Sequence, residues 1–205
     1  LAAALTDRKV GAGEAITCNG HLEPDKPDRY RCWIFKQSLG TRHHGPLEGP
    51  EAIARSCNIF FYTLGRRLGG PRITDWYSQF GLGHSTGCGL DEEVAGDLPS
   101  DGGVKLNTAD ATFMGIGQGP VQWTPMQAAA SYAALARGGY WKSPTLFRDP
   151  EIVKKPQEDH DLQLDPRGVD EALEGLFQAV NAPYRSEEHT SELQSPCNLV
   201  CRLLL

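Results

Sequence analysis

The sequence predicts a predominantly helical domain with few strands. Three segments carry helical patterns with recognisable start and stop signals, at residues 50–70, 71–81 and 124–139. Tyr30-Arg31-Cys32-Trp33-Ile34 has the aromatic and β-branched composition that favours a strand, and Gly11 to Thr17 could form a short helix or the end of a strand. The chain has 205 residues, 40% hydrophobic and 22% charged, so it is long enough to bury one core.

The segment 50–70 begins and ends as helices commonly do. Pro50 suits a first turn, where one N–H has no partner, and Glu51 is favoured there by the helix dipole. Gly69 and Gly70 are typical of a helix end. Between them, apolar residues recur at the three- and four-residue spacing of a buried face: Ile53, Cys57, Phe60, Phe61, Leu64 and Leu68.

Ser56-Cys57-Asn58 interrupts this pattern. Serine and asparagine side chains bond to nearby backbone groups, which weakens a helix interior and favours a break. We therefore expect two helices that meet at a short turn, with Ser56 and Asn58 facing a cleft. The alternative is that both are ordinary solvent-facing residues, because short patterns such as Ser-x-Asn often arise by chance.

The remaining helices follow in chain order. Pro71 opens a helix that ends at Gly81. A further helix starts at Thr124, whose hydroxyl can cap the backbone while Gln127 reaches back in a capping box. Asp170 is expected to cap a last helix with four residues on one buried face: Leu173, Leu176, Phe177 and Val180.

Charge and composition exclude several classes of function. The net charge is -6 and there is no basic cluster, which argues against nucleic acid as a partner. The glycine-rich loop 80–87 lacks the pattern of a phosphate-binding loop. The six cysteines, at positions 18, 32, 57, 88, 197 and 201, are too few for a disulfide scaffold of this size and form no Cys-x-x-Cys pair.

The run Ala-Ile-x-x-Ser-Cys-x-x-x-Phe-Tyr at residues 52–62 resembles the transpeptidase domain of class B penicillin-binding proteins of the elongation type. In that family the run carries Ser-x-Asn, the second of three active-site motifs. Phe-Gly-x-Gly-x-x-Thr-Gly at 80–87 and Gly117-Gln118-Gly119 extend the similarity, which covers roughly residues 11 to 182. The resemblance implies an α/β (α+β) fold of the penicillin-binding protein and serine β-lactamase kind, present in part and mainly as its helical portion.

The resemblance also implies roles for two residues. Ser56 matches the hydroxyl that relays a proton between the catalytic lysine and the leaving nitrogen, and Asn58 matches the amide that positions that lysine and binds the substrate backbone. The family's other motifs, Ser-x-x-Lys and Lys-Thr-Gly, are absent from the 205 residues. We therefore expect both to lie outside this chain, and we expect the chain alone to be inactive.

The implied parent enzyme is a D,D-transpeptidase that cross-links D-Ala-D-Ala stem peptides of peptidoglycan by serine acyl transfer and binds β-lactams. It is expected on the periplasmic side of the bacterial inner membrane, held by an anchor outside this sequence, in the company of the cell-elongation machinery. The alternative is a non-catalytic domain of the same fold that serves as a sensor or an assembly partner.

Residues 185–205 do not continue the resemblance. Arg-Ser-Glu-Glu-His-Thr-Ser-Glu-Leu-Gln-Ser at 185–195 matches one translated frame of a common sequencing adapter. We therefore expect a partial native domain over 1–184 and a non-native tail over 185–205. The alternative is a genuine amphipathic tail.

Cys18, Cys32, His44 and Cys57 form a set of soft ligands that precede or lie within the Ser-Cys-Asn motif. Three cysteines and one histidine are a usual complement for a closed structural zinc site, although here loops would have to bring them together. Some elongation-type family members are similar in having a structural zinc at this place, with carboxylates where this chain has Cys18 and Cys32. A Cys18–Cys32 disulfide, or buried thiols without any bond, are the alternatives. No cofactor is expected for catalysis.

Overall fold

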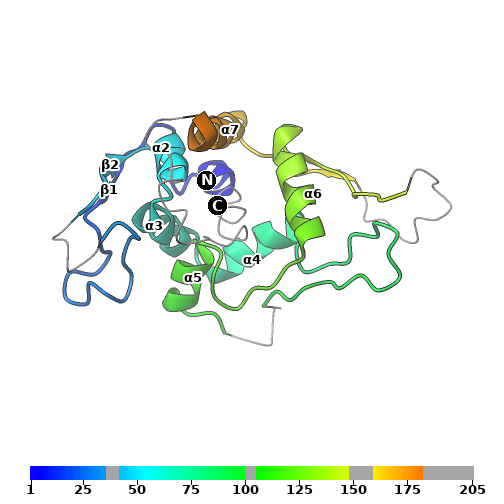
Figure 1. Cartoon of the computed structure of the whole chain (residues 1–205), viewed down its shortest axis with the longest axis horizontal. Helices are drawn as coiled ribbons and strands as arrows, with labels where there is room; N and C mark the ends of the chain where they lie inside the picture. The colour runs from blue at the N-terminus through cyan, green and yellow to red at the C-terminus, as the bar shows by residue number, and fades with distance from the viewer. Residues whose placement is uncertain (36–41, 100–104, 148–158, 182–205) are drawn as a thin grey trace.

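The computed structural model describes residues 1–35, 42–99, 105–147 and 159–181. Within these ranges the chain forms seven helices and four short strands, shown in Figure 1: α1 Ala2–Thr6, β1 Ile16–Cys18, β2 Gly45–Leu47, α2 Gly49–Ala54, α3 Asn58–Leu68, α4 Gly70–Gln79, α5 Thr108–Met114, α6 Pro125–Ala136, β3 Tyr140–Trp141, β4 His160–Asp161 and α7 Pro166–Asn181. The strands make two separate antiparallel pairs, β1–β2 and β3–β4. The prediction of a mainly helical domain with few strands is confirmed.

Helix α3 occupies the centre of the core. It packs against α4, α5 and strand β1, while α7 covers α2 and α1 at one edge (Figure 1). Side chains on most sides of α3 are buried, and not only those of a single stripe: Ile59, Phe60, Phe61, Tyr62, Leu64 and Leu68. The apolar spacing of the sequence identified this helix, but it underestimated how completely the helix is enclosed.

The contact between α3 and α5 depends on two glycines. A Cβ atom on Gly65 would collide with the carbonyl oxygen of Ala111, and a Cβ on Gly115 would collide with that of Phe61. The two helices therefore approach each other backbone to backbone, which only residues without a side chain allow.

The predicted helix boundaries are largely confirmed. Helix α2 ends at Ala54 and α3 begins at Asn58, so the helical pattern is broken at the Ser-Cys-Asn motif as expected. Helix α4 occupies the segment predicted after Gly70. At the start of α6 the capping box is complete, because the Thr124 hydroxyl accepts from the Gln127 amide at 3.2 Å and the Gln127 side chain accepts from the Thr124 amide at 2.8 Å.

The strand predicted at residues 30–34 is wrong. Its pairing is confined to one isolated bridge, between Arg31 and His21. Tyr30 turns inward and packs against Tyr62 and Phe113, and a turn at Cys32 follows at once. The aromatic composition of this stretch therefore reflects burial in a side-chain cluster and not membership of a sheet.

The prediction for the last helix was also wrong in two respects. Helix α7 begins at Pro166, where the Asp165 carboxylate accepts from the Arg167 amide at 2.9 Å, and not at Asp170. Phe177 and Val180 are 64% and 62% exposed. The predicted Leu173 and Leu176 are partly buried and pack against the core. The fully buried positions are Gly168, Val169, Ala172 and Gly175, because α1 and α2 approach this helix too closely for larger side chains.

The tail predicted at 185–205 lies outside the described residues. Among the helices of the described ranges, none combines the length and the apolar character that a bilayer crossing requires.

Candidate functional site

The turn between α2 and α3 holds Ser56 in an unusual backbone conformation. Its φ angle is +52°, in the left-handed region that residues other than glycine seldom adopt. The Ser56 amide donates to the carbonyl of Ile53 at 3.0 Å, and the Cys57 amide donates to that of Ala52 at 2.9 Å. A left-handed residue is a common way to end a helix, but glycine normally occupies it. The serine hydroxyl is thereby placed directly before the first turn of α3.

Ser56 is less accessible than the sequence suggested. Its exposed fraction is 2%, whereas Asn58 is half-buried. The expectation of two polar side chains open to a cleft is therefore not met for the serine. One physical reason is that residues 31–33 lie against this turn and hydrogen-bond to it at both ends.

Two of those contacts involve residues that the sequence analysis did not single out. The side-chain amide of Asn58 donates to the carbonyl of Arg31 at 3.2 Å. The indole N–H of Trp33 donates to the carbonyl of Arg55 at 3.0 Å. The signal that could have pointed to this segment was the position of Trp33 directly after the candidate metal ligand Cys32.

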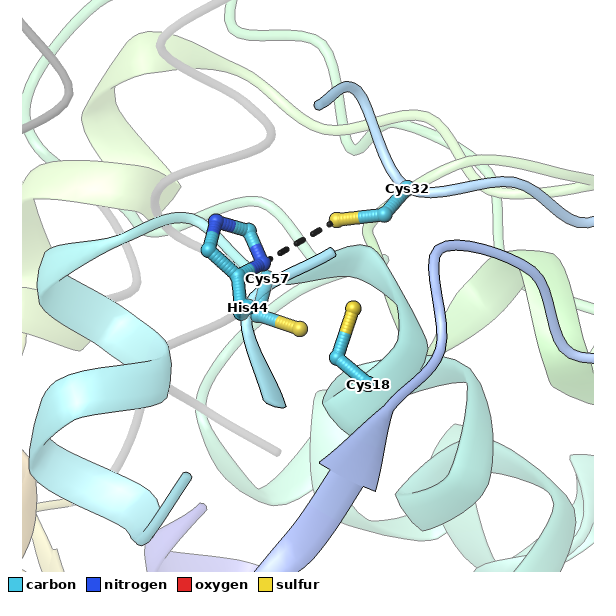
Figure 2. Close-up of side chains that lie close together, drawn as sticks. All are labelled: Cys18, Cys32, His44 and Cys57. Carbon is cyan, nitrogen blue, oxygen red and sulfur yellow. Dashed lines mark hydrogen bonds between the residues drawn. The ribbon is translucent and has the colours of Figure 1, made fainter. Parts of the chain in front are cut away.

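The four candidate metal ligands converge at the same turn (Figure 2). The β1–β2 register places Cys18 opposite Gly45, the residue after His44. Backbone bonding between Cys32 and Gly20 returns the intervening loop to the end of β1. Cys57, which caps the N-terminus of α3, completes the set. Four residues separated by up to 39 positions are thus gathered by the loops, as the zinc hypothesis required.

The geometry of this cluster suits a tetrahedral ion. The three Sγ atoms and one imidazole nitrogen all lie within 4.8 Å of one another, and Cys32 Sγ is 3.5 Å from His44 Nδ1 (Figure 2). Metal–ligand bonds of about 2.0–2.3 Å in a tetrahedron imply ligand separations of roughly 3.5–3.8 Å. The cysteines are fully buried and His44 is half-buried. All four cysteines of the described residues, including Cys88, are free thiols.

The electrostatics of the cluster favour negative charge on one sulfur, that of Cys18. Hydrogen bonds from Cys32 and Cys57 lower the pKa of the Cys18 thiol far below its ordinary value. Burial alone would lower the pKa of His44, but its bonds to Cys18 and Cys32 outweigh burial and raise it to about 9. Burial raises the pKa of the Cys57 thiol.

The glycine-rich loop is organised internally. The Glu93 carboxylate accepts from the amides of Thr86 and Gly87 at 2.7 and 2.8 Å, and from the hydroxyls of Ser85 and Thr86. These donors are the groups that a phosphate would need. Because a carboxylate of the chain already uses them, the loop is a structural connection, in agreement with the absence of a phosphate-binding motif.

This fold and motif order define a class of protein. A family model described as the penicillin binding protein transpeptidase domain matches residues 1–194. The chain therefore belongs to the penicillin-binding protein transpeptidase family, and the resemblance to its elongation type is confirmed.

Particular relatives sharpen this assignment. The chain is similar to the peptidoglycan D,D-transpeptidase MrdA of Haemophilus influenzae, with 29% identity over 88% of this chain and 29% of the relative. It is 34% identical to the stage V sporulation protein D of Bacillus subtilis over 73% of this chain and 22% of that protein. Among solved structures, Pseudomonas aeruginosa PBP2 in complex with WCK 5153 superimposes with a TM-score of 0.75 at 28% identity, over 89% of this chain and 41% of that one. The chain thus spans well under half the length of these relatives.

Proposed function

We propose that the protein to which this chain belongs is a peptidoglycan D,D-transpeptidase of the elongation type, which joins stem peptides by serine acyl transfer. The observation that carries the proposal is the buried Ser56, held left-handed between two helices, with Asn58 as the first residue of α3. This is the Ser-x-Asn motif of the family in a defined geometry. The similarity to MrdA and PBP2 supports the same reaction.

Acyl transfer from D-Ala-D-Ala requires an activated serine, a stabilised oxyanion and a proton for the departing amine. In the proposed reaction the Ser-x-x-Lys motif, absent from these 205 residues, supplies the nucleophile and its base. The Ser56 hydroxyl passes the proton, since a hydroxyl donates and accepts at once. Asn58 positions the lysine and the substrate backbone through its planar amide, which presents both polarities.

Burial and a fixed backbone suit Ser56 to this relay. A proton relay must stay within hydrogen-bond reach of both partners during the reaction. Helix-end hydrogen bonds at Ser56 and Cys57 fix the backbone, and low exposure reduces competition from bulk water. The left-handed conformation, which costs roughly 1–3 kcal/mol, is tolerated because its surroundings determine it.

Kinetics of acylation by a fluorescent penicillin test these roles. The protein used should carry this chain joined to segments that supply Ser-x-x-Lys and Lys-Thr-Gly. Ser56→Ala and Asn58→Ala should each slow acylation by about 10² to 10⁴, the usual cost of losing an acid–base participant. Ser78→Ala is the matched control, because Ser78 hydrogen-bonds His84 at 2.9 Å on the exposed side of α4. Near-normal acylation in both test variants would refute the assigned roles.

The chain by itself should not react with penicillin, because it contains no Ser-x-x-Lys. Labelling of the 205-residue chain that survives denaturation would contradict this expectation. The same assay addresses the alternative, a non-catalytic sensor or assembly domain. If the protein with all three motifs remains unlabelled while folded, the alternative is correct.

We further propose a location on the periplasmic side of the inner membrane and a partnership with the elongation machinery. The location is supported by the similarity to peptidoglycan D,D-transpeptidases. The partnership is supported by the fold shared with Helicobacter pylori PBP2, which was solved in a complex with MreC and superimposes with a TM-score of 0.71 at 20% identity. Fractionation of cells that produce the longer protein, followed by cross-linking, tests both statements. Recovery in the cytosol without cross-linked partners would contradict them.

We also propose that Cys18, Cys32, His44 and Cys57 hold a structural zinc ion. The support is their convergence within 4.8 Å and the chemistry of the donor set. When bound, the ion would cross-link β1, the loop before α2 and the Ser-Cys-Asn turn. It would take no part in the reaction, because four protein ligands leave no open position.

Metal analysis of the purified chain tests the zinc site. One zinc per chain is expected for the unaltered protein and for Cys88→Ser, since Cys88 is buried outside the cluster. Cys18→Ser should lower zinc affinity by on the order of 100-fold or more, because even outer partners of a metal are worth 10–100-fold. Absence of stoichiometric zinc from the unaltered chain would refute the site.

A further inference from the structure

Residues 31–33 run antiparallel to the Ser-Cys-Asn turn and contact it one after another. The Arg31 carbonyl accepts from Asn58, the Cys32 sulfur belongs to the same cluster as that of Cys57, and the Trp33 indole donates to Arg55. The segment 31–33 thus runs along the turn and contacts the residues on each side of Ser56. None of these contacts involves the Ser56 side chain. The Trp33 contact is the one that acts on the peptide bond directly before Ser56.

That peptide bond determines the conformation of Ser56. Its N–H donates to the Ile53 carbonyl, and its C=O, that of Arg55, accepts from Trp33. The Arg55 carbonyl follows the last residue of α2, where carbonyls lack a partner within the helix. The indole supplies that partner, so both polar ends of the Arg55–Ser56 peptide are fixed.

Fixation matters because the φ angle of Ser56 is unfavourable for an L-residue. Rotation of the Arg55–Ser56 peptide plane would relieve the positive φ angle of +52°. Any such rotation has to break the bond from Trp33. The indole therefore opposes the movement by which this turn would otherwise relax.

Trp33 also touches the metal-ligand cluster. Its ring packs edge-on against the His44 imidazole, with centroids 5.7 Å apart and an interplanar angle of 63°. The same side chain thus contacts a ligand of the cluster with its ring and the active-site turn with its N–H. Trp33 itself is half-buried and packs against the core, which limits its own freedom.

We propose that Trp33 is a positioning residue that holds Ser56 in its left-handed conformation and links that conformation to the Cys₃His cluster. The importance of this role for acyl transfer rests on the proposed function of Ser56. The structural role of Trp33 does not depend on that function, because it concerns only the backbone of residues 55–58.

Trp33→Phe separates the two contacts. Phenylalanine keeps an aromatic ring against His44 but has no N–H to donate to Arg55. Trp141→Phe is the matched control, since the Trp141 indole also donates to a backbone carbonyl, that of Phe80 at 2.9 Å, at a site beside α6. Both variants lose one indole hydrogen bond to the main chain, and only the first loses it at the turn.

The measurement is residue-resolved amide hydrogen exchange of the 205-residue chain by NMR, together with zinc content. In Trp33→Phe, exchange at residues 55–58 should accelerate by about two- to tenfold, the range that one hydrogen bond contributes. Zinc content should stay at the level of the unaltered chain. In Trp141→Phe the amides of 55–58 should not respond.

Unchanged exchange at 55–58 in Trp33→Phe would overturn the proposal, and so would an equal acceleration in both variants. If Trp33→Phe fails to fold, the fallback is the unaltered sequence with 5-fluorotryptophan at position 33. Ser56→Gly removes the strain of the positive φ angle, so it should shift the ¹⁹F resonance of that side chain. An unshifted resonance would overturn the proposal. Failure of the proposed function is distinguishable, because Ser56→Ala would then leave acylation normal while the exchange result for Trp33→Phe stood.

Discussion

The two ends of helix α3 are held in different ways. Beyond its first turn, α3 lies backbone to backbone against α5, where Phe61 faces Gly115 and Gly65 faces Ala111 with no room for a further side chain. Its N-terminal end begins at Asn58 and is fixed by polar bonds to residues 31–33 and by the Cys₃His cluster. One end depends on close packing, and the other depends on a few directional contacts.

This difference indicates that packing and directional bonds have separate roles along a single helix. Close packing fixes position within narrow limits and is lost only when the core opens. Directional contacts can fix an unfavourable backbone such as that of Ser56, but each is worth little alone, and each can be removed locally. The first change below tests the close packing of α3, and the others test single directional contacts elsewhere in the chain.

The largest effect on stability is expected for Gly65→Ala. Alanine in a helix would normally gain about 1 kcal/mol over glycine. Here its Cβ would collide with the Ala111 carbonyl oxygen of α5, so the sign reverses and the free energy of unfolding should fall by about 1–3 kcal/mol. Denaturant unfolding measures this loss, and zinc content should not change.

Gly11→Ala is the control for this substitution. A Cβ at Gly11 would meet its nearest neighbour, Glu14, at an ordinary 3.7 Å, so stability should change by no more than about 0.5 kcal/mol. If Gly65→Ala proves neutral or stabilising, the close contact of α3 and α5 is not as described.

A smaller effect is expected for Thr124→Ala, which removes one half of the capping box of α6. The hydroxyl that accepts from the Gln127 amide would be lost, at a cost of about 1 kcal/mol. Thermal unfolding should show the loss, while Ser143→Ala on the following segment tests for a general effect of removing a hydroxyl. A larger shift in the control than in Thr124→Ala would contradict the importance of the cap.

The smallest effect is a pH dependence at Glu93. Burial raises the pKa of this carboxyl, but bonds from Thr86, Ser85 and Gly87 outweigh burial and lower it below its ordinary value of 4.5. A carboxyl with a lowered pKa in the folded state adds stability above its unfolded pKa, and this stability disappears as the pH falls through the lowered value.

Glu93→Gln should therefore be less stable than the unaltered chain near neutral pH, and the difference should shrink in acid and vanish once the pH has fallen through the lowered pKa of Glu93. Unfolding curves at several pH values give this difference, with the exposed neighbour Glu92→Gln as control. A difference that persists undiminished in acid would contradict the carboxylate's role in the loop.

Local signals in the sequence were enough to place most helices. Proline and threonine mark the starts of α4 and α6, and the polar triplet marks the break before α3, because caps and breaks act over a few residues. Tyr30 and Phe177 were misread, because burial of an aromatic side chain depends on neighbours distant in sequence.

The residues of the candidate site could be predicted from the sequence, but the contacts that hold them in place could not. Ser56 and Asn58 could be named from the motif, and the four metal ligands from their side-chain types. The left-handed φ of Ser56 and the bond from Trp33 to Arg55 could not, because they arise from loops that meet only in the folded chain. Such long-range contacts leave no periodic pattern in a sequence.

Hydrogen exchange of the 205-residue chain with and without zinc, residue by residue, tests most directly whether the two ends of α3 are held separately. Metal removal should accelerate exchange by about tenfold or more at residues 55–58 and around Cys18 and Cys32, through local opening. Exchange at Leu64 and Leu68, in the part of α3 beside α5, should stay unchanged. A uniform acceleration along the whole helix, or none at the turn, would contradict the separation of the two ends.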